Sequence, residues 1–146
     1  MSIKRFGNAE TREIQEIEQK YNLHLPTDYL KFLHECNGAL CENYDAIKLK
    51  NFDEFIHLRA LYGVLTGNEY EGIGIDHWMS QYGHELPDGT ILIGDSIENG
   101  FIILLCSGED SGVYYWDDTR YFECSNDESN TYFIADTFTE FISGII

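Results

Sequence analysis

Six consecutive apolar residues, from Phe101 to Cys106, place the strongest limit on what this chain can fold into. The run shows no alternation of apolar and polar residues, so we expect both faces of the strand that it forms to be covered. Shorter apolar runs at 91–93 and 113–116 flank it, separated from it by Gly, Asp, Ser and Asn. This spacing predicts a three-stranded antiparallel meander over residues 90–116. Segments 47–49, 121–124 and 132–135 are expected to add short strands.

Two amphipathic helices are predicted before the sheet. Ile14, Ile17 and Tyr21 recur at helical spacing, and either Asn8 or Thr11 could supply the N-cap oxygen of the first helix. The second helix is expected to start at Pro26 and to end where Asn37 and Gly38 interrupt the apolar stripe.

The rest of the chain gives one strong helix signal and one weaker one. Thr137 followed by Glu140 is a capping box, which predicts a last helix with a buried stripe that includes Phe138 and Phe141. In the middle of the chain a short helical turn is expected at 52–55, and glycines delay the start of another helix until Ile75.

These patterns together predict an α+β fold. Two N-terminal helices and one C-terminal helix pack on a mostly antiparallel sheet built from residues 45–135, in a single domain spanning residues 1–146. A chain of 146 residues with 43% apolar composition can bury a sizeable core. It shows no signal-peptide pattern and no apolar run long enough to cross a membrane. Its four cysteines form no CxxC pair, so we expect reduced thiols and a cytoplasmic location.

Charge is distributed very unevenly along the chain. From Leu61 onward there are sixteen acidic residues and a single basic one, Arg120, whereas the first 60 positions hold ten acidic and eight basic residues. Such a surface repels phosphates, which excludes nucleic acid as a ligand. The acids either serve solubility or meet a basic partner.

Two groups of residues resemble the SUKH superfamily, α+β domains shared by fungal cell-wall-assembly regulators and many bacterial immunity proteins. The first group lies in the second helix and its end: Leu25, Pro26, Asp28, Tyr29, Phe32, Leu33, Asn37 and Gly38. The second follows the family's order of strand, glycine turn, strand and closing helix: Ile93, Gly94, Asp95, Gly100, Val113, Tyr114, Asp117, Ala135, Asp136, Thr137, Phe138 and Phe141. The chain departs from the pattern at Ala39, where many members have a second glycine.

The resemblance implies a binding protein without catalytic activity, typically an immunity factor that blocks a toxin domain. Signature residues are expected to be structural: Pro26, Tyr29, Phe32, Leu33, Asn37, Gly38, Gly94, Gly100, Trp116, Phe138 and Phe141. Recognition should then lie in the variable surface.

Patterns for metals and cofactors are weak in this chain. His34, Cys36 and Cys41 lack the paired spacing of a zinc site, and His77 and His84 lack an HExxH context. The GxG at Gly72 follows no predicted strand, as a dinucleotide loop would require. We therefore expect neither a metal site nor a cofactor.

Catalytic motifs are equally weak. Adjacent acids such as Asp117 and Asp118 usually point into solvent, and no GxSxG is present. No enzyme is expected. A small hydrolase or metal-dependent enzyme stays as one alternative, and a regulatory protein-interaction scaffold as another.

The acids have a predicted place in the meander, because successive turns alternate between the two ends of a sheet. Asp95, Glu98, Asp117 and Asp118 should share one end. Glu109 and Asp110 should lie at the opposite end as secondary candidates. Tyr115 and Tyr121 are candidate aromatic anchors beside the first set. A solvated acidic face and ordinary packing of the aromatics are the competing interpretations.

The sequence thus favours an immunity protein, or antitoxin, that binds and neutralises a cognate secreted nuclease toxin domain through an acidic surface. A ribonuclease is favoured over a deoxyribonuclease. The expected partner is a protein with a basic surface, and the expected oligomeric state is a monomer or weak dimer. Carboxylates would occupy the partner's phosphate-binding groove and speed encounter.

Overall fold

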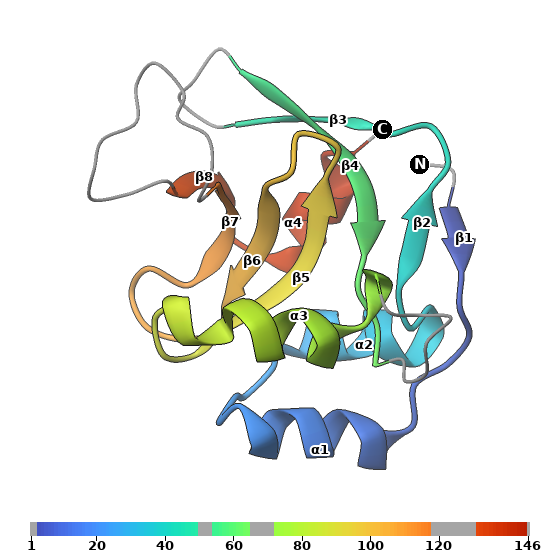
Figure 1. Ribbon diagram of the computed structural model, residues 1–146, viewed down its shortest axis with the longest axis vertical. Helices are drawn as coiled ribbons and strands as arrows, with labels where there is room; N and C mark the ends of the chain where they lie inside the picture. The colour runs from blue at the N-terminus through green and yellow to red at the C-terminus, as the bar shows by residue number, and fades with distance from the viewer. Residues whose placement is uncertain (1–2, 50–53, 65–71, 118–130, 146) are drawn as a thin grey trace.

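A twisted antiparallel sheet runs through the molecule, with α3 on one face and α2 and α4 on the other (Figure 1). The structure, a computed structural model, describes residues 3–49, 54–64, 72–117 and 131–145. In chain order the elements are β1 (Ile3–Arg5), α1 (Thr11–Lys20), α2 (Thr27–Glu35), β2 (Ala39–Cys41), β3 (Ala46–Lys48), β4 (Phe55–Leu61), α3 (Ile75–Tyr82), the 3-10 helix η2 (Gly83–Glu85), β5 (Thr90–Ser96), β6 (Phe101–Leu105), β7 (Gly112–Trp116), β8 (Thr131–Ala135) and α4 (Phe138–Ser143).

The strand order of the sheet is β1-β2-β4-β5-β6-β7-β8, and β3 pairs with β4 beside this path. Each of these strand pairs is antiparallel. The α+β class, the meander of β5, β6 and β7 and the two N-terminal and one C-terminal helices are therefore confirmed. Strand β6, the middle strand of the meander, is buried on both faces from Phe101 to Leu104, as its unbroken apolar run predicts.

The predicted extent of the sheet was too short. β1 and β2 lie outside residues 45–135, yet they join the sheet through pairing of β2 with the end of β4. The turn of helix predicted at 52–55 is wrong at its end, because Phe55 opens strand β4. The other residues of that turn, and the segment 121–124, lie outside the described residues.

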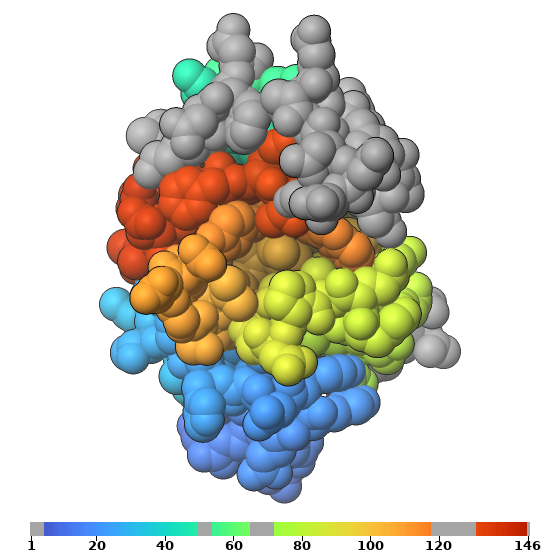
Figure 2. All heavy atoms as spheres, turned by 90° about the vertical axis from the view of Figure 1, so that its left-hand side faces the viewer, coloured from blue at the N-terminus to red at the C-terminus, as the bar shows by residue number. Residues whose placement is uncertain are grey.

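The N-cap of helix α1 differs from both residues that the sequence analysis suggested. Helix α1 is capped by Glu10, which forms a capping box with Glu13, instead of by either predicted residue. Asn8 donates a hydrogen bond from Nδ2 to the carbonyl of His34. On the face shown in Figure 2, α1 (blue), α3 (yellow-green) and the β6–β7 turn (orange) lie close together.

Helices α2 and α4 meet through aromatic side chains over the sheet. The Tyr29 ring lies 5.0 Å from that of Phe138, and the Phe32 ring 5.2 Å from it. Thr137 caps α4 by accepting a hydrogen bond from the Glu140 amide, as predicted. Asp28 joins the two helices, because its Oδ2 accepts hydrogen bonds of 2.9 Å from both the amide and the hydroxyl of Thr139.

A tight crossing of two chain segments fixes the end of α2. Asn37 and Gly38 both have positive φ, and Asn37 Oδ1 accepts a 2.7 Å hydrogen bond from the Val64 amide. Gly63 passes so close that a Cβ on it would lie 2.1 Å from the Asn37 carbonyl oxygen. The Asn-Gly pair therefore both ends the helix and holds the segment after β4.

This crossing makes a direct prediction about stability. Changing Gly63→Ala is expected to lower the free energy of unfolding by about 2 kcal/mol or more, because backbone must move to admit the methyl group. Gly72→Ala is the matched control, since a Cβ there meets nothing within 4 Å. Urea unfolding of both variants checks this, and equal stabilities for the two would contradict the close crossing.

Candidate binding surface

The register of the meander shows at which end of the sheet the described acids lie. Asp95 pairs with Phe101, and Phe101 pairs with Trp116, so Asp95 and Asp117 lie at the same end of the sheet. The β5–β6 turn is at this end too, and Asn99 in it has a positive φ of 73°. The β6–β7 turn lies at the opposite end.

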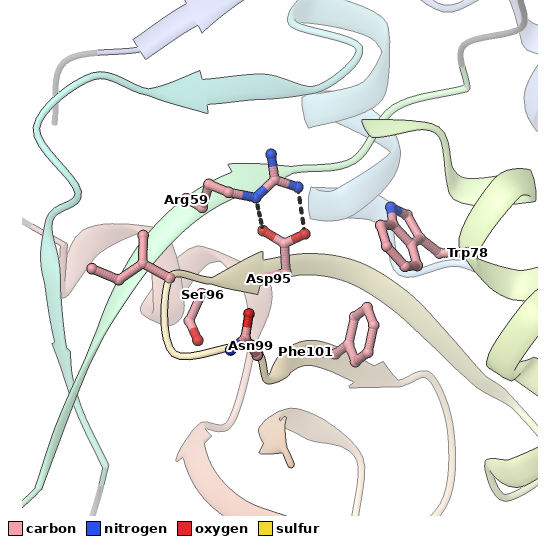
Figure 3. A pocket seen from close by; sticks show the side chains of 7 residues that line it. Arg59, Trp78, Asp95, Ser96, Asn99 and Phe101 are labelled. Carbon is pink, nitrogen blue, oxygen red and sulfur yellow. Dashed lines mark hydrogen bonds and ion pairs between the residues drawn. The ribbon is translucent and has the colours of Figure 1, made fainter. Parts of the chain in front are cut away.

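Asp95 does not face solvent, although the sequence analysis assigns it to an acidic binding surface. It is only 7% exposed and accepts hydrogen bonds from Arg59 at both oxygens, from Nε at 2.7 Å and from Nη2 at 2.5 Å (Figure 3). The Tyr62 hydroxyl donates a third, at 2.6 Å. A buried carboxylate needs such partners, because an unpaired one would lose its hydration without compensation.

The electrostatics of this cluster reflect burial and pairing together. Burial raises the pKa of Asp95, while the hydrogen bonds from Arg59 and Tyr62 act in the opposite direction. Burial and the Asp95 carboxylate both raise the pKa of Tyr62 well above its usual range. Burial alone would lower the pKa of Arg59, but the bonds and charge of Asp95 outweigh it and raise that pKa. Asp95 thus joins β4 to β5.

Glu98 is likewise held by a neighbouring strand. Its Oε1 accepts a 2.8 Å hydrogen bond from the His57 amide, and its Oε2 lies 2.8 Å from His57 Nδ1. The side chain is 18% exposed. Burial acts to raise the pKa of Glu98, but the bonds from His57 outweigh it, so that the pKa is lowered. This carboxylate fixes the β5–β6 turn to β4.

Two more residues of the predicted binding surface lie in the interior. Asp117 and Tyr115 are both fully buried, and the Tyr115 hydroxyl lies 2.9 Å from Ser96 Oγ. That hydroxyl occupies the space above Gly100, where a Cβ would come within 2.1 Å of it. Burial raises the pKa of Tyr115 to about 12. Asp118 and Tyr121, the remaining members, lie outside the described residues.

Exposed carboxylates gather instead at the opposite end of the meander, which we call the acidic end: Glu85, Asp88, Glu109, Asp110 and Asp136. The Cys106 amide donates to the Gly89 carbonyl, which brings the segment before β5 beside the β6–β7 turn. In Figure 2 this turn (orange) lies next to the yellow-green end of α3 and η2. The partly buried Tyr114 lies among these acids, and burial and the charges of Asp110 and Asp136 raise its pKa.

A cavity of about 450 Å³ opens beside the Arg59–Asp95 pair. Trp78 and Phe101 line one side of it, and Ser96 and Asn99 line the other (Figure 3). Ile97 also lines the cavity. Sequence reasoning missed the contribution of Arg59 and Trp78. One signal was available, since His57 and Arg59 alternate with Ile56, Leu58 and Ala60 as a half-buried strand requires.

Metal-binding side chains do not cluster in the part of the chain that the structure describes. No three His, Cys, Asp or Glu side chains there are placed to hold a metal ion. Cys36, Cys41 and Cys106 are free thiols, and burial raises the pKa of Cys41 and of Cys106 to about 12. Within the same residues, every helix is too short or too polar to span a membrane.

The Glu98 contacts predict a pH-dependent contribution to stability. A lowered pKa means that the contribution is present above the ordinary glutamate pKa of about 4.3 and is lost as the pH falls through the folded-state value. Glu98→Gln should therefore be about 1 kcal/mol less stable than the parent at pH 6, with the gap narrowing toward pH 3. Chemical unfolding across this range measures it. Glu109→Gln, at an exposed position, is the control and should show no such convergence. A gap for Glu98→Gln that stays constant with pH would contradict the assignment.

Comparison with known proteins identifies the family of this chain. A search of curated proteins finds no match to the chain. The sequence pattern of the SMI1 / KNR4 family (SUKH-1) matches residues 8–144, nearly the whole chain. This match is consistent with an immunity role and agrees with the earlier resemblance. The chain belongs to the SMI1 / KNR4 family (SUKH-1).

Proposed function

We propose that this protein is an immunity protein that binds and neutralises a cognate secreted nuclease toxin domain, with a ribonuclease favoured over a deoxyribonuclease. Family membership supports a protein-binding role. The observation that carries the proposal is the acidic end, where exposed carboxylates gather around Tyr114. It offers a partner of opposite charge an electrostatically complementary surface.

The charge around this surface is almost entirely of one sign. Residues 72–117 and 131–145 contain no Lys or Arg. Glu109 and Asp110 are exposed and lie in one turn, while the described acids of the other end are buried or held by Arg59 and His57. The secondary candidates of the sequence analysis therefore become the primary ones.

The same geometry suits inhibition of a nuclease. A nuclease attracts phosphates with Lys and Arg, so a hydrogen-bonded turn that presents carboxylates would compete for the same groove. Tyr114 is anchored for this purpose, because its hydroxyl donates a 2.5 Å hydrogen bond to the Asp110 carbonyl and its ring packs against Phe133 at 5.5 Å. A fixed aromatic side chain beside charges is a common anchor in protein interfaces.

The test uses the toxin domain encoded by the neighbouring reading frame. The parent protein should form a complex with that domain and restore growth of cells that express it. Changing Glu109→Gln together with Asp110→Asn should slow association about three- to tenfold at low salt, because two steering charges are lost, and should flatten the dependence of the on-rate on salt. Stopped-flow or surface binding kinetics measure both effects.

The matched control removes two exposed acids elsewhere, Glu35→Gln with Glu42→Gln, and so gives the same net charge. This control pair should change the on-rate much less than the pair in the acidic end. Equal slowing by both pairs would show that only net charge matters. Failure of the parent to bind the domain or to restore growth would refute the immunity function.

A further inference from the structure

The cavity beside the Arg59–Asp95 pair has unused hydrogen-bonding capacity of both kinds. Arg59 uses Nε and Nη2 on Asp95 and the Gly72 carbonyl, and its Nη1 makes no hydrogen bond to any described residue. The side-chain amide of Asn99 is also without a partner among those residues. Asp95 Oδ1 accepts one hydrogen bond, from Arg59 Nε, and a carboxylate oxygen can accept another.

The other walls of the cavity are aromatic and apolar. The Trp78 and Phe101 rings meet edge to face with centroids 5.3 Å apart, and Trp78 also stacks on Tyr62 at 5.9 Å. Ile97, which also lines the cavity, is 47% exposed although it is a large apolar residue. A ring inserted between these walls would cover apolar surface that water now contacts.

The walls are held in place before any ligand arrives. Trp78 Nε1 donates a 3.1 Å hydrogen bond to the Gly72 carbonyl, which also accepts one from Arg59. The β5–β6 turn is closed by the bond from the Ser96 amide to the Gly100 carbonyl and by the contact of Glu98 with His57. Because these parts need little ordering on binding, the cavity can favour one ligand shape.

The charges inside the cavity select among ligand classes. A carboxylate would lie beside Asp95 and would approach a chain of formal charge −17, and an ammonium or guanidinium group would lie beside Arg59. A purely apolar group would bury Arg59 Nη1 and the Asn99 amide without partners. A phenol avoids all three costs, because its ring is apolar and its neutral hydroxyl both donates and accepts.

We propose that this cavity is a binding site for the side chain of a tyrosine presented by a protein partner. A volume of about 450 Å³ admits such a ring. The cavity and the acidic end lie at opposite ends of β5 and β6, about 20 Å apart for strands of this length, so one partner can contact both. The identity of that partner as a toxin rests on the proposed function, whereas the selectivity of the cavity does not.

The test uses p-cresol, the side-chain analogue of tyrosine, and the whole protein. Titration followed by NMR should shift the Trp78 indole N–H and the Asn99 side-chain amide signals, with a dissociation constant of about 1–10 mM. The chain has two tryptophans, and Trp116→Phe assigns the Trp78 indole signal. Acetate and methylguanidinium, analogues of an acidic and a basic side chain, should bind at least tenfold more weakly.

Asn99→Gly tests the polar end of the site without straining the turn, since glycine accepts the positive φ of this position. It should weaken p-cresol binding at least threefold. Asn22→Gly, another exposed position with positive φ, is the control and should leave binding unchanged. The proposal is overturned if p-cresol leaves both signals unmoved at 20 mM (about twice the highest expected dissociation constant), if either charged probe binds as tightly, or if Asn99→Gly binds p-cresol like the parent. None of these results depends on growth rescue by the immunity function, so the two proposals fail separately.

Discussion

The buried carboxylate of Asp95 is the group on which much of the arrangement depends. It receives two hydrogen bonds from Arg59 and one from Tyr62, and so joins β4 to β5 on the side of the sheet that faces α3. Arg59 extends the connection to the Gly72 carbonyl, which also accepts from Trp78 on α3. Removing one member would leave a buried charge unpaired, which costs more than the pair itself contributes. This hydrogen-bonded cluster therefore links the β4–β5 pair, the start of α3 and one wall of the cavity.

This pairing divides the acids of the meander into two groups with different roles. Asp95 and Glu98 are used within the fold, where Arg59 and His57 provide their partners. The carboxylates of the acidic end keep their exposure, and the chain places no Lys or Arg on the neighbouring described strands to neutralise them. Exposed negative charge is thus concentrated at this end of the described meander. A partner with a basic groove would meet it there.

The sequence predicted the meander, the closing helix and the end of α2, because each has a local signal: an unbroken apolar run, a capping box and an Asn-Gly pair. It did not predict β1 and β2, whose three-residue strands are stabilised by pairing with distant segments. The alternation of turns between the two ends of a sheet correctly predicted that Asp95 and Asp117 lie at the same end. It could not show that they are buried, because burial depends on Arg59, which is 36 positions from Asp95 in the chain, and on Tyr62. The alternation in β4 could predict a half-buried strand, but it could not show that Arg59 pairs with Asp95 on another strand.

The central claim is that the acidic end, and no other acidic part of the surface, meets the toxin domain. Amide hydrogen exchange of the protein, alone and in complex with that domain, tests this claim most directly. The account predicts slower exchange on binding in the β6–β7 turn, from Cys106 to Ser111, and around η2, with little change in α2 and β2. Protection confined to α1, α2 or the β1–β2 edge, with the β6–β7 turn unchanged, would contradict it.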